Sequence, residues 1–229
     1  TGLDTSLETM RDDLLRMGSL VEEQIVRAVQ ALKARDMVKA QEVIDTDARV
    51  NELRYKVESD AIRVIATQQP AARDLRLIIT AVHMAAEMER IADHARGIAK
   101  LSIRIGDEPL IKPLIDIPRM QEIACSMLHD AISAYIAMDV RAAEAIAGRD
   151  AEVDELYRQV LRELLTYMMQ DQRRITQGTY LLWIAHNLER IADRVINICE
   201  RIVFAETGEL KEYKPAHSAA VPVTVDSAG

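Results

Sequence analysis

The sequence predicts an all-α protein made of two tandem antiparallel three-helix bundles related by an internal repeat. Three observations support this fold class. Apolar residues recur at alternating spacings of three and four over most of the chain, which is typical of amphipathic helices. Only 8 of 229 residues are glycine and 6 are proline, and aromatic residues make up 3%. The motif Glu-Arg-Ile-Ala-Asp occurs at 89–93 and again at 189–193.

Three long helices are predicted in the first half. The first runs from Leu3 to about Arg35 with one continuous apolar face. The second covers about 36–67 and ends before Pro70, because the residue that precedes a proline is disfavoured in helical geometry. The third covers about 72–105, and the alanines on its apolar face allow close approach of neighbouring helices.

The second half repeats this plan after a short linker. A fourth helix is defined by apolar residues from Met120 to Met138, a fifth continues from Ile146 to about Gln170, and a sixth covers about 175–207. Proline and glycine between the halves mark the linker, and small residues with prolines mark the end of the chain. The predicted domains are a first bundle at 1–106, a linker at 107–117, a second bundle at 118–213 and a flexible tail at 214–229.

Composition and charge exclude several classes of function. The formal net charge of −8 argues against general nucleic-acid binding, which needs a basic surface. No apolar run approaches the roughly 20 residues of a membrane span. Cys125 and Cys199 lack the spacing of a zinc site or a disulfide framework and are expected to be core residues. Without a basic and apolar leader, the chain is predicted to be cytoplasmic.

The repeated motif places a Glu and an Asp one helical turn apart, on one face of a helix. Folding the first hairpin at Pro70 brings Asp47 level with Asp93, and Asn51 level with Glu89, on two antiparallel helices. The same construction, with a turn near Gln172, sets Asp150 and Asp154 level with Asp193 and Glu189. Acidic groups are therefore expected to meet between two helices in each half.

These acids are predicted to bind metal ions. Asp47 and Asp150 each interrupt an apolar stripe, where a carboxylate is costly unless it is paired or metal-bound. Oxygen donors alone suit magnesium, manganese or iron, and zinc is a further alternative. The predicted ligands are Asp47, Glu89, Asp93, Asp150, Asp154, Glu189 and Asp193. The alternative is a salt-bridge network with neighbouring arginines, namely Arg54, Arg90, Arg158 and Arg190.

No catalytic constellation is evident, so the chain is predicted not to be an enzyme. It contains no glycine-rich phosphate loop and no nucleophile elbow. The histidines near the acids do not form the Glu-x-x-His spacing of di-iron carboxylate bundles. A carboxylate-bridged metalloenzyme and a plain helical scaffold remain the alternatives to a binding protein.

Several segments together resemble the PhoU family, regulators of bacterial phosphate uptake and phosphate-responsive signalling. The resemblance extends over about 3–213, and the stretches that show it are Leu14-Leu15-Arg16-Met17-Gly18, Gln69-Pro70-Ala71-Ala72-Arg73-Asp74-Leu75-Arg76, Leu188-Glu189-Arg190-Ile191-Ala192-Asp193 with Asn197-Ile198, and Thr207-Gly208-Glu209. It implies two three-helix bundles with pseudo-symmetry, and metal binding by Glu89 with Asp93 and by Glu189 with Asp193. Gly97 departs from the family pattern, in which an Asn is expected, and Asn51 stands where the second half has Asp154. The first site is therefore expected to hold metal more weakly.

The resemblance also implies a function. A PhoU-like protein is expected to be a negative regulator that links the ATPase of the phosphate ABC transporter to a membrane sensor histidine kinase. It would act as a cytoplasmic signalling adaptor, peripheral at the inner membrane through these partners, and as a homodimer. Neither the composition nor the motif spacing shows these partners.

Overall fold

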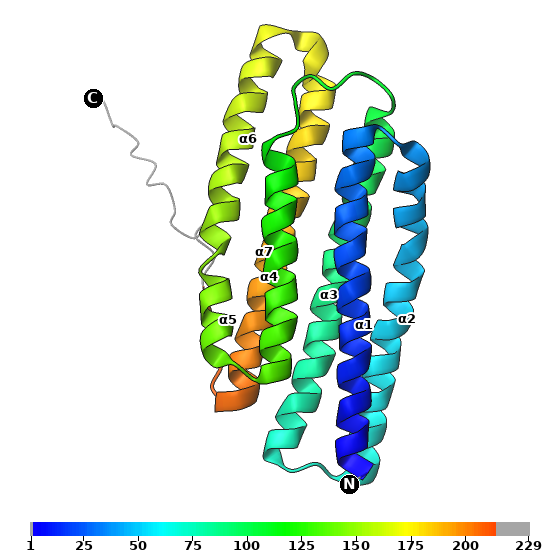
Figure 1. Ribbon diagram of the computed structural model, residues 1–229, viewed down its shortest axis with the longest axis vertical. Coiled ribbons are helices and arrows are strands. Elements are labelled where there is room, and N and C mark those ends of the chain that lie inside the picture. Colours follow the sequence, from blue (N-terminus) through cyan, green and yellow to red (C-terminus); the bar gives the residue numbers. More distant parts are fainter. Residues whose placement is uncertain (1, 214–229) are drawn as a thin grey trace, which may run out of the picture.

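The computed structural model describes residues 2–213, and its regular elements there are all helical. The first bundle consists of α1 (Gly2–Ala34), α2 (Met37–Gln68) and α3 (Ala72–Ile105). The second consists of α4 (Asp116–Ala137), α5 (Val140–Ala147), α6 (Asp150–Gln170), the 3-10 helix η1 (Gln172–Arg174) and α7 (Ile175–Thr207). Successive long helices run antiparallel along one common direction (Figure 1). The predicted fold class is confirmed, whereas the tail predicted at 214–229 lies outside the described residues.

The turns between the first helices have clear local causes. Asp36 caps α2, since its side chain accepts a hydrogen bond from the Lys39 backbone N–H at 2.9 Å. At the other end of α2, Gln69 has a left-handed backbone with φ 47°, directly before Pro70. Proline disfavours helical geometry at the preceding residue, so the chain reverses here as predicted.

The fifth predicted helix is not continuous, which corrects the sequence prediction. The backbone N–H of Arg149 donates to Ile146 O at 3.0 Å, and that of Glu152 donates to Arg149 O at 3.1 Å. Such i to i+3 bonds tighten the chain, and Gly148 is a poor helix former, so α5 ends and α6 begins anew. Asp150 thereby falls in the first turn of α6, where the helix dipole favours a carboxylate.

The connection between the halves is held against the start of α7. Gln177 accepts a hydrogen bond from the backbone N–H of Ile111 at 2.7 Å and donates one to Pro109 O at 3.1 Å. This connection joins the end of α3 to the start of α4 across one end of the molecule (Figure 1). α4 begins at Asp116, inside the segment 107–117 that the sequence predicts as linker, and the division into domains at that segment stays a prediction.

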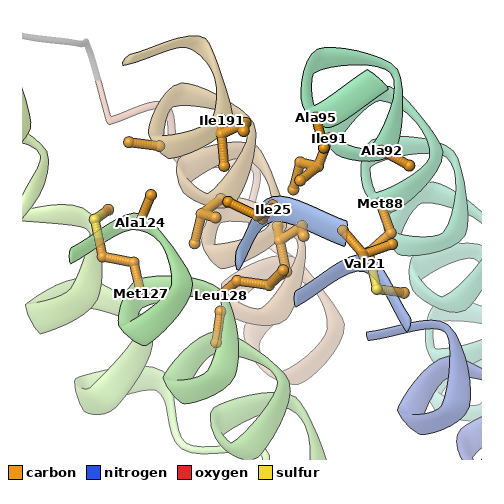
Figure 2. Close-up of a cluster of buried hydrophobic side chains, with 14 of the residues drawn as sticks. Val21, Ile25, Met88, Ile91, Ala92, Ala95, Ala124, Met127, Leu128 and Ile191 are labelled. Atoms are coloured by element: carbon orange, nitrogen blue, oxygen red, sulfur yellow. The ribbon is translucent and has the colours of Figure 1, made fainter. Parts of the chain in front are cut away.

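One continuous core joins the two bundles. Figure 2 shows where α1, α3, α4 and α7 meet, with Ile25, Ile91, Leu128 and Ile191 pointing into a shared cluster. All four side chains are fully buried. Ile91 and Ile191 are the central residues of the two motif copies, so the repeat itself forms the contact between halves. α2 and α6 lie on the outside of this arrangement (Figure 1).

Both cysteines are free thiols, and Cys199 is a core residue as predicted, whereas Cys125 packs against the edge of the core. Cys199 is fully buried on α7, and burial raises its pKa to about 12. Cys125 on α4 is half-buried, and burial raises its pKa to about 11. Neither thiol is therefore ionised at neutral pH.

Candidate metal centre

The repeated motif directs its acids toward the outer helix of each half. Its Ile and Ala are fully buried in the core in both copies. The Glu and Asp on either side of them consequently lie at the edge of the core. In the first half this edge faces α2, and in the second half it faces α6.

In the first half, an arginine that the sequence analysis did not identify joins the predicted ligands. Arg96 on α3 donates from Nη1 to Asp47 Oδ2 at 2.9 Å and from Nη2 to Asp93 Oδ1 at 2.7 Å. Asp47 on α2 and Asp93 on α3 therefore lie at one level, as the hairpin geometry predicts. Arg54 on α2 also approaches, with Nη1 at 3.7 Å from Glu89 Oε2.

The charges of these acids act on one another. Burial raises the pKa of Asp47, with the Arg96 guanidinium opposing this rise and Asp93 adding to it. Burial also raises the pKa of Glu89, and the negative charge of Asp93 raises it further. The first half is thus a set of three mutually repelling carboxylates that is held together by two arginines.

The second half places its predicted ligands deeper. Asp150 is 3% exposed, Asp154 is fully buried and Glu189 is 4% exposed, whereas the side chain of Asp93 in the first half is 42% exposed. Asp150 and Asp154 lie one turn apart on α6, and Glu189 and Asp193 lie one turn apart on α7. Burial of three carboxylates between two helices requires positive charge or hydrogen-bond donors nearby.

Two basic side chains of α7 and one tyrosine of α6 surround these acids. His186 Nδ1 lies 3.4 Å from Glu189 Oε2, and Arg190 Nη1 donates to Asp193 Oδ2 at 2.7 Å. The ring of Tyr157 is centred 6.0 Å from that of His186. The pKa of Tyr157 is raised by burial and by the charge of Glu189. These contacts place Tyr157 of α6 beside Glu189 of α7.

The side chains are near one another without converging on a single point. Within residues 2–213, no group of three or more His, Cys, Asp or Glu side chains is arranged so that it could hold a metal ion. Metal binding would therefore require carboxylates to reorient. By donor chemistry, the second half suits a hard cation, because it offers the buried carboxylates of Asp150, Asp154 and Glu189 and the nearly buried one of Asp193. The seven predicted ligands stay a prediction.

A polar contact between α3 and α7 follows the same repeat symmetry. His94 Nδ1 lies 2.9 Å from Asn187 Oδ1, while Glu87 Oε2, at the position equivalent to Asn187, accepts from Asn197 at 3.2 Å. Arg194 adds an ion pair, with Nη1 at 3.6 Å from Glu87 Oε2. Sequence periodicity could not find these pairs, because they join residues from the two halves of the chain.

The side chain of Asn187 leaves little room for a side chain at position 97. A Cβ at Gly97 would lie 3.1 Å from Asn187 Oδ1, closer than side chains normally approach. The equivalent position in the second half holds Asn197, which faces Glu87 instead. The two ends of the α3–α7 contact therefore differ in composition.

Comparison with known proteins decides the family. The family model of the PhoU domain matches the chain twice, at residues 14–102 and 117–202. The chain belongs to the PhoU family. The two matches fall on the two bundles, which confirms the internal repeat.

Within residues 2–213, no helix has the run of apolar residues that is needed to span a membrane.

Curated relatives match over nearly their whole length. The chain is 39% identical over 198 residues to the phosphate-specific transport system accessory protein PhoU homolog of Caulobacter vibrioides, covering 86% of each chain. It is 36% identical over 207 residues to the homolog of Clostridium acetobutylicum, covering 90% of this chain and 94% of the relative. It is 34% identical over 206 residues to PhoU of Escherichia coli, covering 90% and 86%.

Two crystal structures of PhoU proteins resemble the fold closely. The phosphate transport system regulatory protein PhoU from Streptococcus pneumoniae matches with a TM-score of 0.86 at 32% identity, over 92% of this chain and 100% of that one. PhoU from Pseudomonas aeruginosa matches with a TM-score of 0.84 at 35% identity, over 90% and 99%. The paired-bundle architecture is thus shared with PhoU proteins from two different bacteria.

Proposed function

We propose that this PhoU-family chain regulates phosphate homeostasis, as a negative regulator of phosphate uptake and of phosphate-starvation signalling. The observation that supports this role is the match of both repeats to the PhoU domain, together with curated relatives named as accessory proteins of the phosphate-specific transport system. The finer role is an adaptor between the ATPase of the phosphate ABC transporter and a sensor histidine kinase. Such an adaptor would act as a homodimer at the cytoplasmic face of the membrane.

A binding role suits the described structure better than catalysis. The acids that the sequence singles out lie between outer and inner helices, and Asp47, Asp150, Asp154 and Glu189 are buried. A carboxylate of this kind is well placed to set the local packing of helices through a bound cation. Coupling of ion occupancy to helix packing is a way for a regulator to change the surface that its partners contact.

The metal-binding part of the proposal places the ion in the second half. Asp150 and Asp154 of α6, with Glu189 and Asp193 of α7, would hold iron, manganese, magnesium or zinc through oxygen atoms. The bound ion would supply positive charge between the two helices. Tyr157 and His186 lie against Glu189 and would restrict the positions of that carboxylate.

The regulatory role predicts the phenotype of a deletion. Removing the gene from its host is expected to raise expression of phosphate-scavenging genes several-fold in phosphate-rich medium, because the sensor kinase is no longer inhibited. Transcript levels of those genes, measured in rich and in limiting phosphate, give the result. Complementation with the intact gene serves as the control. Unchanged expression in rich phosphate would contradict the proposed regulatory role.

A further inference from the structure

The two halves of the chain differ in the cations that face their acids. When the sequence of the hairpin α2–α3 is aligned with that of the hairpin α6–α7, Asp47 corresponds to Asp150 and Asp93 to Asp193. At the same correspondence, Arg54 is replaced by Tyr157 and Arg96 by Ile196. The first half therefore has two arginines that the second half lacks.

Arg96 lies between two of the acids of the first half. One guanidinium spans two helices, because its two Nη atoms donate to Asp47 on α2 and to Asp93 on α3 at 2.9 and 2.7 Å. Hydrogen bonds between charged groups at these lengths are among the strong ones in proteins. The third acid, Glu89, has Arg54 Nη1 at 3.7 Å.

Position 196 of the second half holds isoleucine where the first half has Arg96. Ile196 is 3% exposed, so its side chain is packed in the interior. Arg190 contacts Asp193, but both residues are on α7, so this pair does not join α6 to α7. The second half also carries one more acid, since Asp154 stands where the first half has Asn51.

We propose that Arg96 is a built-in counter-cation that closes the first half to metal ions. This inference rests on the metal-binding part of the proposed function. A divalent ion at Asp47 and Asp93 would have to break both hydrogen bonds of Arg96 and would be repelled by the guanidinium. The first half also offers less negative charge to a metal ion, because the neutral Asn51 stands where the second half has Asp154.

The test uses Mn²⁺ alone as the probe and the full chain as the protein. The background variant is Glu189→Ala with Asp193→Ala, which removes the α7 ligands of the second half. Arg96→Ile, added to this background, copies the residue of the second half into the first. The readouts are Mn²⁺ bound per chain after gel filtration and the change in thermal midpoint on adding Mn²⁺. The control, Arg104→Ile, removes an exposed arginine from the same helix.

The background variant is expected to bind no Mn²⁺ and to show no shift of its midpoint. Adding Arg96→Ile is expected to create about one Mn²⁺ site per chain and to raise the midpoint by roughly 5–10 °C at about 100 times the dissociation constant. Arg104→Ile should create no site. Arg96→Lys, which keeps a positive charge, is expected to keep the first half closed.

Other outcomes would overturn the inference. If the background variant already binds Mn²⁺ and Asp47→Ala abolishes that binding, Arg96 does not exclude metal. If Arg96→Ile gains no binding although circular dichroism shows a folded chain, Arg96 is not what closes the site. Should Arg96→Ile fail to fold, Arg96→Gln removes the charge while keeping a hydrogen-bond donor. A wild-type chain without any Mn²⁺ response would defeat the metal part of the proposed function, and Arg96→Ile would then decide the inference alone.

Discussion

Replacing Glu189 and Asp193 together by alanine is expected to reduce the metal content of the purified chain to background. These residues supply the α7 side of the second-half site, where all four candidate carboxylates are buried or nearly so. Two remaining acids on one helix offer too few ligands for tight binding of a hard cation, which prefers about six or more oxygen atoms. Elemental analysis of the variant beside the wild-type chain measures the loss.

The matched control for this variant carries the same change in charge, with one position in the last turn of α7 and one just after that helix. Glu206→Ala with Glu209→Ala also removes two carboxylates, but both positions are exposed and lie away from the acids of α6. This control is expected to keep the wild-type metal content. Equal metal content in all three proteins would show that Glu189 and Asp193 are not ligands.

Ile191→Ala is expected to lower the free energy of unfolding by about 2–5 kcal/mol. Ile191 is fully buried where α7 meets the other central helices (Figure 2), so the shorter side chain leaves a cavity in the core shared by both bundles. Folded domains are stable by only about 5–15 kcal/mol, and the loss is a large part of that total. Urea unfolding followed by circular dichroism measures the change.

The control for the core variant is Ile62→Ala on the outer helix α2. Ile62 is 70% exposed, and its truncation should alter the free energy of unfolding by no more than about 0.5 kcal/mol. If the two variants lose the same stability, the central contact between the bundles is not what holds the halves together. If urea unfolding shows two transitions and Ile191→Ala destabilises only one of them, the bundles unfold separately.

Long helices with one apolar face were predictable, whereas the break in the second half was not. α3 and α7 follow a regular spacing of buried residues that leaves little choice of secondary structure. At Gly148 the apolar spacing continues across the break, and the backbone there keeps a helical φ of −68°. Periodicity alone therefore favours a continuous helix, although hydrogen bonding changes at this point.

The levels of the acids could be predicted, but the arginine that joins them could not. Antiparallel helices joined at a known turn bring residues equidistant from that turn together, which explains why Asp47 and Asp93 meet as expected. Arg96 follows Asp93 by three residues, a spacing that usually gives a surface ion pair on one helix. Its reach to α2 depends on how the two helices pack. Comparison of the two repeats, with Arg96 against Ile196, is the signal in the sequence that could have found it.

Contacts between the two halves could not be predicted from the sequence for a related reason. The repeat predicts two similar bundles, and their faces toward each other depend on shape complementarity between residues far apart in the chain. His94 with Asn187, and Glu87 with Asn197, illustrate this, because nothing local marks any of them as a partner. In the sequence, the residues of the shared core around Ile91 and Ile191 likewise form only two separate apolar stripes.

Elemental analysis of the purified, tag-free wild-type chain tests whether the repeated acids bind metal ions. The chain would be measured before and after dialysis against a chelator, with unfolded chain as a blank. We expect iron, manganese, magnesium or zinc to be retained before dialysis and lost afterwards, with a lower thermal midpoint in the stripped protein. A chain that is metal-free as purified, and whose thermal midpoint responds to none of these ions, would contradict the claim.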